Sequence, residues 1–234
     1  MPDKKKNPHK DHRKRMREEI MRQNNFDALE KHRLLELLLF GAIPRKDTNE
    51  IAHELLETFG SVAGVLDAEV HDLAAVKGMT QNAAIHLKTV MPLARHYQED
   101  KFKKGYKFQN IDEMGSYLIK KHLGKKNETL AITCLDSLGK FIACEIVNEG
   151  SAASVDITFR DIAACVLKHN AQWVIVSHNH STATALPSEE DITMTIELRK
   201  SLSQLNVQLL DHIIISGDDY ISMRQTAKLA SIFK

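Results

Sequence analysis

Residues 177–191 read S-H-N-H-S-T-A-T-A-L-P-S-E-E-D, and the fold and chemistry of the chain are best inferred outward from this stretch. It follows an apolar run, 173–176, that is typical of a buried strand. His178 and His180 are two positions apart, so in extended chain their side chains point to the same side and can reach one metal ion. Asp191 opens an amphipathic run that is typical of a helix. Two imidazoles and one carboxylate form a ligand set that leaves a fourth position on zinc for water.

Ser188 supports two interpretations of the same segment. An acidic residue follows it three positions later, so S-E-E-D is typical of a capping box, and Pro187 favours a helix boundary. An H-x-H pair alone is a weak indication of a metal site, but its combination with this serine and aspartate is much rarer by chance. The two interpretations are compatible, because a capping serine is held rigidly. We therefore predict one zinc ion per chain, bound by His178, His180 and Asp191.

At these residues the sequence resembles the JAMM motif of the MPN (JAB) metallopeptidase fold, and its surroundings resemble the RadC family of bacterial proteins. The matching pieces are N-A-Q-W-V-I-V-S-H-N-H (170–180), P-S-E-E-D (187–191) and L-L-D-H-I-I-I (209–215), within roughly residues 111–225. The resemblance implies a three-layer α/β domain, zinc-dependent hydrolysis of a peptide or isopeptide bond, and an association with DNA repair. RadC proteins usually read H-N-H-P-S-G-D-P where this chain reads H-N-H-S-T-A-T-A. Because the ligands and the loop length are kept, we expect metal binding to survive and substrate shape and rate to change.

The resemblance also indicates a general base and an oxyanion donor. The family's catalytic carboxylate lies on the first strand of the domain, and Glu128, just before the apolar run 129–135, matches that position. Glu145, inside a second apolar run, and Glu149, before a glycine, are the alternatives, and we favour Glu128 over both. Ser188 is expected to stabilise the tetrahedral oxyanion.

Two further residues are candidates for a supporting role. Asn179 lies between the two histidines and points the other way, so its amide is expected to hydrogen-bond a loop or a substrate. His212 follows Asp211 inside an apolar run. This pair either orients a metal ligand or is a satisfied polar pair of the core, and we favour the core pair.

Residues 111–234 alternate strand and helix patterns and are predicted to form a mixed sheet flanked by helices. Apolar or alternating runs predict strands at 129–135, 141–147, 155–158, 173–176, 207–216 and 220–223. Amphipathic runs predict helices at 114–122, 159–169 and 192–205. This arrangement agrees with the α/β MPN fold that the resemblance implies.

Residues 25–98 are helical in pattern throughout, and with their I-P-R-K-D-T-N-E-I-A stretch they resemble the N-terminal domain of RadC proteins. The turn V-K-G-M-T-Q-N-A (76–83) resembles a helix-hairpin-helix, which presents backbone N–H groups to a phosphate. Lys77, Gly78 and Thr80 are therefore candidate contacts to DNA. Thr80 replaces the second glycine of that motif, so a small helical packing module is an equal alternative.

The remaining segments bear on partners and compartment. Residues 1–24 hold nine Lys/Arg against four Asp/Glu and are predicted to be a flexible basic arm, which either touches DNA or is a solvated tail. Residues 99–110 are charged and aperiodic, as in a linker. No apolar run approaches the ~20 residues of a membrane span, and no signal-peptide core is present. Cys134, Cys144 and Cys165 are scattered in apolar segments, as reduced thiols of a cytoplasmic protein would be.

Three functions stay open at this point. The first is a zinc-dependent hydrolase of an amide bond. The second is a DNA-binding accessory protein whose MPN domain is an interaction module. The third is a zinc-dependent nuclease, because a metal-activated water suits an amide and a phosphodiester alike. The resemblance favours the amide.

Overall fold

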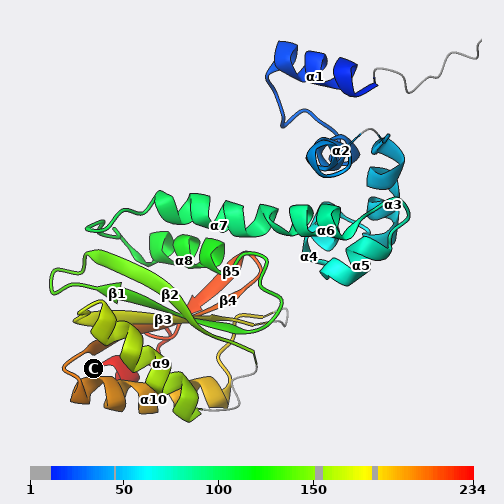
Figure 1. Cartoon of the computed structure of the whole chain (residues 1–234). Helices are drawn as coiled ribbons and strands as arrows, with labels where there is room; N and C mark the ends of the chain where they lie inside the picture. Colours follow the sequence, from blue (N-terminus) through cyan, green and yellow to red (C-terminus); the bar gives the residue numbers. More distant parts are fainter. Residues whose placement is uncertain (1–11, 45, 151–154, 181–183) are drawn as a thin grey trace, which may run out of the picture. The chain divides into compact units, whose positions relative to one another are not determined.

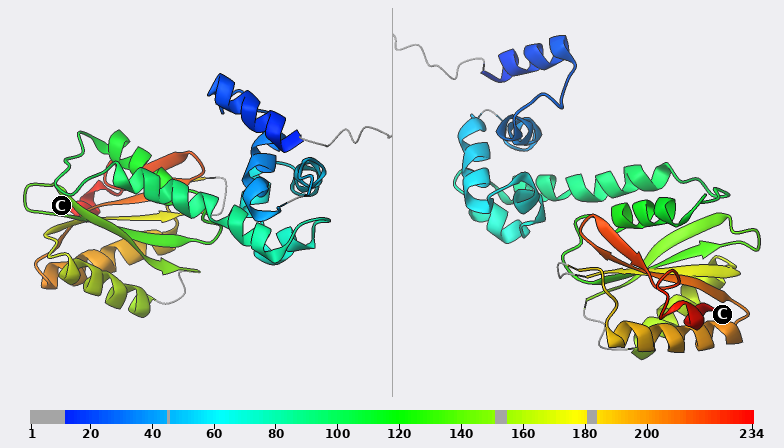
Figure 2. Two further views of the ribbon diagram at one scale, coloured as in Figure 1. Left: turned by 45° about the horizontal axis from the view of Figure 1, so that its top comes forward. Right: turned by 180° about the vertical axis from the view of Figure 1, so that it is seen from behind.

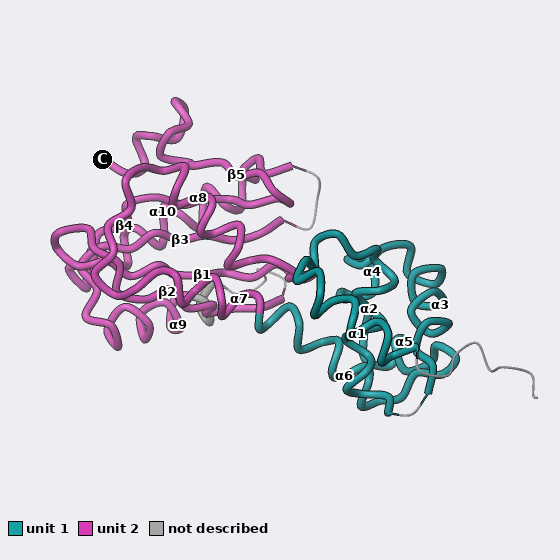
Figure 3. Tube along the Cα trace, turned by 90° about the horizontal axis from the view of Figure 1, so that it is seen from above, with its two compact units in different colours: residues 1–93 teal, residues 94–234 magenta. Residues whose placement is uncertain are grey.

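The computed structural model describes residues 12–44, 46–150, 155–180 and 184–234. The chain divides into two compact units, unit 1 (residues 1–93) and unit 2 (residues 94–234), each of which is described by itself (Figure 3). Among the described residues, no helix combines the length and apolarity that crossing a membrane would take.

The centre of unit 2 is a five-stranded sheet in the order β2-β1-β3-β4-β5 (Figure 1). Its strands are β1 (Thr129–Leu135), β2 (Phe141–Glu149), β3 (Trp173–Asn179), β4 (Gln208–Ser216) and β5 (Asp219–Ser222). β3 and β4 are parallel, whereas the other neighbouring pairs are antiparallel. The predicted mixed sheet is confirmed.

Helices cover both faces of this sheet (Figures 1 and 2). They are α8 (Ile111–Lys121) on one face, and α9 (Val155–Lys168), α10 (Glu189–Gln204) and the short η1 (Ala230–Phe233) on the other. Alternation along β3 explains the two cores: Val174 and Val176 are buried in the core with α9 and α10, whereas Ile175 is buried in the core with α8. This is the three-layer α/β domain that the resemblance implies.

The strand predicted at 155–158 is wrong, because these residues are the first turn of α9. Their sequence, V-D-I-T, alternates apolar and polar residues, and four residues are too few to separate period 2 from period 3.6. Further along, Ile162, Cys165 and Val166 recur at helical spacing and are all buried against the sheet, so the segment forms one helix from Val155 onward.

The predicted linker at 99–110 is also wrong. Its aromatic side chains are part of the α8-side core: the Phe102 ring lies 4.7 Å from that of Tyr117, and the Phe108 ring 5.5 Å from it, centroid to centroid. Backbone hydrogen bonds also tie the segment to Phe141 at the start of β2. The lysines suggested a linker, but the interleaved aromatic residues bury enough apolar surface to fold it onto unit 2.

Among the described residues of unit 1 the regular elements are all helices, as predicted. Its helices are α1 (His12–Gln23), α2 (Lys31–Ala42), α3 (Asn49–Phe59), α4 (Val62–Asp67), α5 (Val70–Ala75) and α6 (Gln81–Lys88), and α7 (Val90–Asp100) begins here and continues into unit 2. α3 ends at Gly60, whose φ of 76° is the left-handed conformation that glycine adopts without cost.

α1 corrects the prediction that residues 1–24 form a flexible arm. Met16 and Ile20, four positions apart on one helix face, are 2% and 8% exposed. They pack with Leu29 and Phe40 in a small core of their own. The predicted arm before α1 lies outside the described residues, so only its second half can be corrected.

Candidate metal centre

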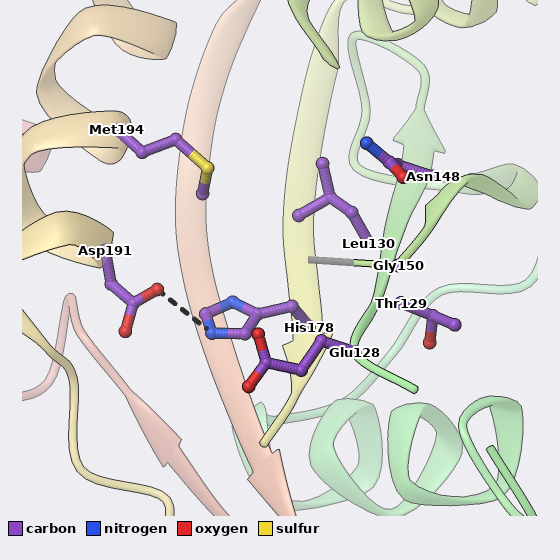
Figure 4. Close-up of a pocket in the computed structure, with 8 residues that line it drawn as sticks. All are labelled: Glu128, Thr129, Leu130, Asn148, Gly150, His178, Asp191 and Met194. Carbon is purple, nitrogen blue, oxygen red and sulfur yellow. Dashed lines mark ion pairs between the residues drawn. The ribbon is translucent and has the colours of Figure 1, made fainter. Parts of the chain in front are cut away.

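His178, His180 and Asp191 converge, as their spacing predicted, from the end of β3 and the first turn of α10. Nε2 of His178 lies 3.1 Å from Oδ1 of Asp191 (Figure 4), and Nε2 of His180 lies 3.3 Å from Oδ2. Tetrahedral zinc with bonds of 2.0–2.1 Å separates neighbouring ligand atoms by about 3.3 Å. The distance from each histidine nitrogen to the carboxylate is close to that spacing, and one ligand atom from each of the three residues lies within 4.8 Å of the others, so the group could hold one ion.

The far nitrogen of each histidine is hydrogen-bonded. Nδ1 of His180 lies 3.2 Å from the carbonyl oxygen of Thr184, which can only accept, so this nitrogen carries the hydrogen. The neutral ring then presents the lone pair of Nε2 to the site. Nδ1 of His178 lies 2.8 Å from Nε2 of His212.

Ser188 and Asp191 form the predicted capping box at the start of α10. The Ser188 hydroxyl accepts from the Asp191 N–H at 3.1 Å and donates to Asp191 Oδ2 at 2.7 Å, and the Ser188 N–H donates to the same oxygen at 2.8 Å. Burial opposes ionisation of Asp191, but the attraction of His178 and the hydrogen bonds from Ser188 outweigh it and hold the pKa of this carboxyl below its ordinary value. The carboxylate is thus kept ionised and oriented.

Glu128 reaches the same place through strand register. β1 and β3 are antiparallel with Leu130 opposite His178, so position 128 extends along the same face toward His180. Glu128, His178 and Asp191 line one pocket (Figure 4). The sequence could match Glu128 to a family position, but only the pairing of β1 with β3 brings it to the histidines.

The two alternative bases have other partners. Oε1 of Glu145 lies 2.7 Å from both Nζ of Lys168 and Nε2 of His169, and hydrogen bonding to Lys168 holds the pKa of Glu145 below its ordinary value. Glu149 pairs with Lys125 at 2.8 Å. Neither carboxylate is among the described residues that line the pocket.

Two other clusters bring three metal-binding groups together among the described residues: Glu145, Cys165 and His169, and separately His12, Glu36 and Asp47. In each, a histidine Nε2 already touches a glutamate oxygen, at 2.7 Å and 2.8 Å respectively. These are direct hydrogen-bond lengths, shorter than the spacing of ligands around an ion. We therefore assign both clusters as hydrogen-bonded histidine–glutamate pairs.

Asn179 points to the opposite face, as predicted, and holds the chain on both sides of Glu128. Its Oδ1 accepts from the Thr129 N–H at 2.9 Å and from the Thr129 hydroxyl at 2.6 Å. Its Nδ2 donates to the carbonyl of Asn127 at 3.1 Å. Nδ1 of His122, at the end of α8, lies 3.2 Å from the same Oδ1.

Sequence reasoning missed His122. It is 4% exposed, and its Nε2 lies 3.1 Å from the hydroxyl of Ser177. Burial lowers its pKa to about 3, although the hydrogen bond to Asn179 acts in the opposite direction. A lone histidine after an amphipathic helix has no spacing that links it to a residue on β3, so no sequence signal identifies it.

His212 contacts the site, so the favoured interpretation of a core pair with Asp211 is wrong. Its ring is completely buried between Nδ1 of His178 and the hydroxyl of Thr195, which lies 2.6 Å from His212 Nδ1. Burial lowers the pKa of His212 well below its ordinary value. The Asp211 carboxylate instead accepts from the hydroxyl of Ser222 at 2.5 Å. Thr195, one helical turn after Asp191, was also missed.

The hairpin residues belong to unit 1, between α5 and α6. Gly78 has φ of 90°, and a Cβ there would lie 2.9 Å from Ile51, so the turn requires glycine at this position. Thr80 has φ of −129° and caps α6 by accepting from the Ala83 N–H at 3.1 Å. A second glycine is therefore unnecessary. Lys77 is exposed.

Comparison with known proteins places this geometry in a family. Residues 108–229 match the RadC-like JAB domain family. A UPF0758 protein of Ruegeria pomeroyi is 34% identical over 215 residues, 92% of this chain and 96% of the relative. UPF0758 proteins of Carboxydothermus hydrogenoformans and a Polaromonas species are 33% and 31% identical, over 90% and 86% of this chain and 92% and 90% of the respective relative. The domain match spans more than half of the sequence and the relatives align along nearly all of it, so this chain belongs to the RadC family and carries a RadC-like JAB domain.

Proposed function

We propose that this RadC-family chain is a zinc-dependent hydrolase that cleaves a peptide or isopeptide bond. The observation that carries the proposal is the convergence of two imidazole nitrogens and one carboxylate, with each nitrogen close to the spacing of zinc ligands from a carboxylate oxygen. Two of these residues, His178 and Asp191, line a pocket together with Glu128. Bound there, zinc supplies a Lewis acid and lowers the pKa of a bound water toward neutrality.

Glu128 is the proposed general base. Amide hydrolysis needs a group that takes a proton from the attacking water and hands it to the leaving amine. The backbone of Glu128 is held on three sides: its carbonyl accepts from the Gly150 N–H at 2.9 Å, and Asn179 binds Asn127 before it and Thr129 after it. A carboxylate on so restrained a segment keeps its place through the reaction.

Ser188 is the proposed donor to the oxyanion: its hydroxyl donates to the ligand carboxylate of Asp191 in this structure and would turn from that oxygen to the oxyanion during the reaction. Leu130 and Met194 supply apolar walls on the side of the pocket between β1 and α10 (Figure 4). Apolar walls exclude water and strengthen the electrostatic interactions within the site. The three free cysteines agree with a cytoplasmic setting, which is part of the proposal.

The decisive experiment is the metal content of the purified protein and its variants. We expect about one zinc per chain in the wild type and in Glu128→Gln, and none in Asp191→Ala. Glu128→Gln should lose about 10²–10⁴-fold in hydrolysis of a peptide substrate. Glu149→Gln, which removes a carboxylate outside the pocket, is the matched control and should keep both zinc and rate.

Full zinc occupancy in both Asp191→Ala and His178→Ala would contradict the assignment. The same purified proteins should be offered single- and double-stranded DNA. If the wild type cleaves DNA and Glu128→Gln does not, the substrate is a phosphodiester and the protein is a nuclease.

As a second candidate function, we propose DNA binding through the hairpin. The association with DNA repair that the family resemblance implies agrees with this proposal. The supporting observation is the left-handed Gly78 next to exposed Lys77, at the start of α6. The basic α1 supports it less, because Arg13 is engaged: its guanidinium donates to the carbonyls of Phe40 at 3.2 Å and Ile43 at 2.6 Å.

Phosphate contacts make affinity fall steeply with salt, so binding to a DNA duplex should be measured at several salt concentrations. Lys77→Glu should weaken binding and reduce the salt slope by about one. Lys31→Glu, at an exposed lysine on α2, is the control. Binding that is absent at low salt, or equal in the two variants, would exclude the hairpin as a DNA site.

A further inference from the structure

We infer that Thr195 and His212 set the tautomer of the metal ligand His178, through a one-directional chain of hydrogen bonds that ends on the backbone of the ligand Asp191. The inference rests on the proposed metal site, since it assigns His178 and Asp191 as ligands. Within that site, Thr195 and His212 act as positioning residues.

This chain of hydrogen bonds consists of three contacts. His178 Nδ1 lies 2.8 Å from His212 Nε2, and His212 Nδ1 lies 2.6 Å from the Thr195 hydroxyl oxygen. The Thr195 hydroxyl oxygen lies 2.5 Å from the carbonyl oxygen of Asp191, four residues earlier on α10. Thr195 and His212 are fully buried and His178 is 7% exposed, so these partners are shielded from exchange with bulk water.

The last contact decides the direction of all three. Two oxygen atoms 2.5 Å apart need a hydrogen between them, and a carbonyl has none, so the Thr195 hydroxyl donates to Asp191. Its only hydrogen is then used, and it must accept from His212. His212 therefore carries its hydrogen on Nδ1, and in its neutral form offers a lone pair on Nε2 to His178.

The consequence falls on the metal side of His178. Because Nε2 of His212 accepts, Nδ1 of His178 must donate, so Nε2 of His178 is the nitrogen left for the metal site. This Nε2 faces Asp191 through a hydrogen when no ion is bound and offers its lone pair when that hydrogen is released to an ion. In the opposite direction Nδ1 of His178 would accept, and the hydrogen of the ring would be fixed on Nε2, where it would exclude an ion. The sulfur of Met223, 3.6 Å from the Thr195 hydroxyl, also only accepts, so it leaves the direction unchanged.

The same chain ties two ligands together. His178 lies on β3, His212 on the neighbouring β4, and Thr195 and Asp191 on α10. These buried hydrogen bonds connect α10 to β3 and β4 and so fix the position of Asp191 relative to His178. Partners of this kind typically contribute 10- to 100-fold to metal affinity.

The first test reads the tautomers directly. Long-range ¹H–¹⁵N correlation spectra of the full-length protein, labelled in histidine and free of metal, should show the hydrogen of His212 on Nδ1 and a protonated Nδ1 on His178. Added zinc should leave both unchanged while the Nε2 signal of His178 shifts. A hydrogen on Nε2 of His212 would overturn the inference, and this result does not depend on whether the protein binds zinc.

The second test removes the hydroxyl at constant shape. Thr195→Val should lower zinc affinity about 10- to 100-fold, measured by competition with a chromophoric chelator, and should give a mixture of His212 tautomers. Thr195→Ser keeps the hydroxyl and should restore both. Thr193→Val is the matched control: exposed Thr193 makes the same type of hydroxyl-to-carbonyl bond on α10, to Glu189 at 2.9 Å.

Folded Thr195→Val protein with wild-type zinc affinity and a single His212 tautomer would overturn the inference. If Thr195→Val fails to fold, Thr195→Ser and the wild-type spectra still decide the direction of the chain. Absence of zinc binding in the wild type would contradict the proposed function alone, because the tautomer of His212 remains measurable in that protein.

Discussion

Asp191 uses one carboxylate for both of the purposes that the S-E-E-D pattern indicates. It completes the capping box with Ser188 and also faces His178 and His180. The cap orients the carboxylate by two hydrogen bonds, from the backbone and the hydroxyl of Ser188. At this residue the helix start and the metal site are a single structure.

Ser188→Ala should therefore affect stability and zinc affinity together. Loss of the cap should lower the free energy of unfolding by about 1 kcal/mol, measured by urea denaturation. Loss of the hydroxyl donor should also weaken zinc binding. Ser61→Ala removes an equivalent cap, where the serine accepts from the Gly64 N–H at 2.9 Å in unit 1, and should lower stability without changing zinc affinity. Equal zinc affinity in both variants would show that Ser188 is only a cap.

At the scale of elements, α8 is joined to β1 and β3 through His122, which burial keeps neutral with its pKa lowered to about 3 from 6.5. Because the unfolded chain binds a proton at higher pH than the folded chain does, the contribution of this group is complete above pH 6.5 and declines as pH falls toward 3. Between pH 6.5 and 5 it should remove about 2 kcal/mol. His122→Gln should flatten this dependence, measured as the free energy of unfolding in urea.

His71→Gln is the control for His122, because the side chain of His71 is 95% exposed. It should leave the slope of stability against pH unchanged. Buried His212 acts in the same direction as His122, so the slope should fall in His122→Gln without vanishing. An unchanged slope in His122→Gln would mean that His122 takes up its proton as readily in the folded protein as in the unfolded chain.

The hairpin between α5 and α6 depends on one glycine. Gly78→Ala should destabilise unit 1 by about 1–3 kcal/mol, because of the positive φ and the close approach to Ile51. Gly105→Ala shares the φ of 90° but would meet nothing within 4 Å, so it isolates the backbone term. Equal losses in the two variants, each measured by thermal unfolding, would show that the contact with Ile51 is easily relieved.

At the scale of the whole molecule, each compact unit has hydrophobic clusters of its own. Among the residues that the structure describes, the cluster on each face of the sheet is formed by unit 2 residues, and the two helical clusters are formed by unit 1 residues. A fragment of residues 90–234, which keeps α7 complete, should therefore unfold cooperatively on heating and bind zinc as tightly as the full chain. A fragment that does not fold, or that binds zinc markedly more weakly, would show that unit 2 needs unit 1.

The sequence by itself determined the local parts of this protein. H-x-H at a strand end and S-x-x-D at a helix start are set by periods of two and by capping chemistry, both of which act within a few residues. The same holds for Gly60 at the end of α3 and for most strands and helices of unit 2. These features could be predicted because their causes lie next to them in the chain.

Tertiary structure alone decided which distant groups join them. Glu128 meets His178 through the register of β1 on β3, and His212 and Thr195 meet it across β4 and α10. The patterns of residues 99–110 and 1–24 predict a linker and a flexible arm, because the packing partners of the aromatic residues in the first and of the apolar face of α1 in the second lie far along the sequence. Register and packing depend on the summed burial of residues that are remote in the chain, and a local pattern does not contain that information.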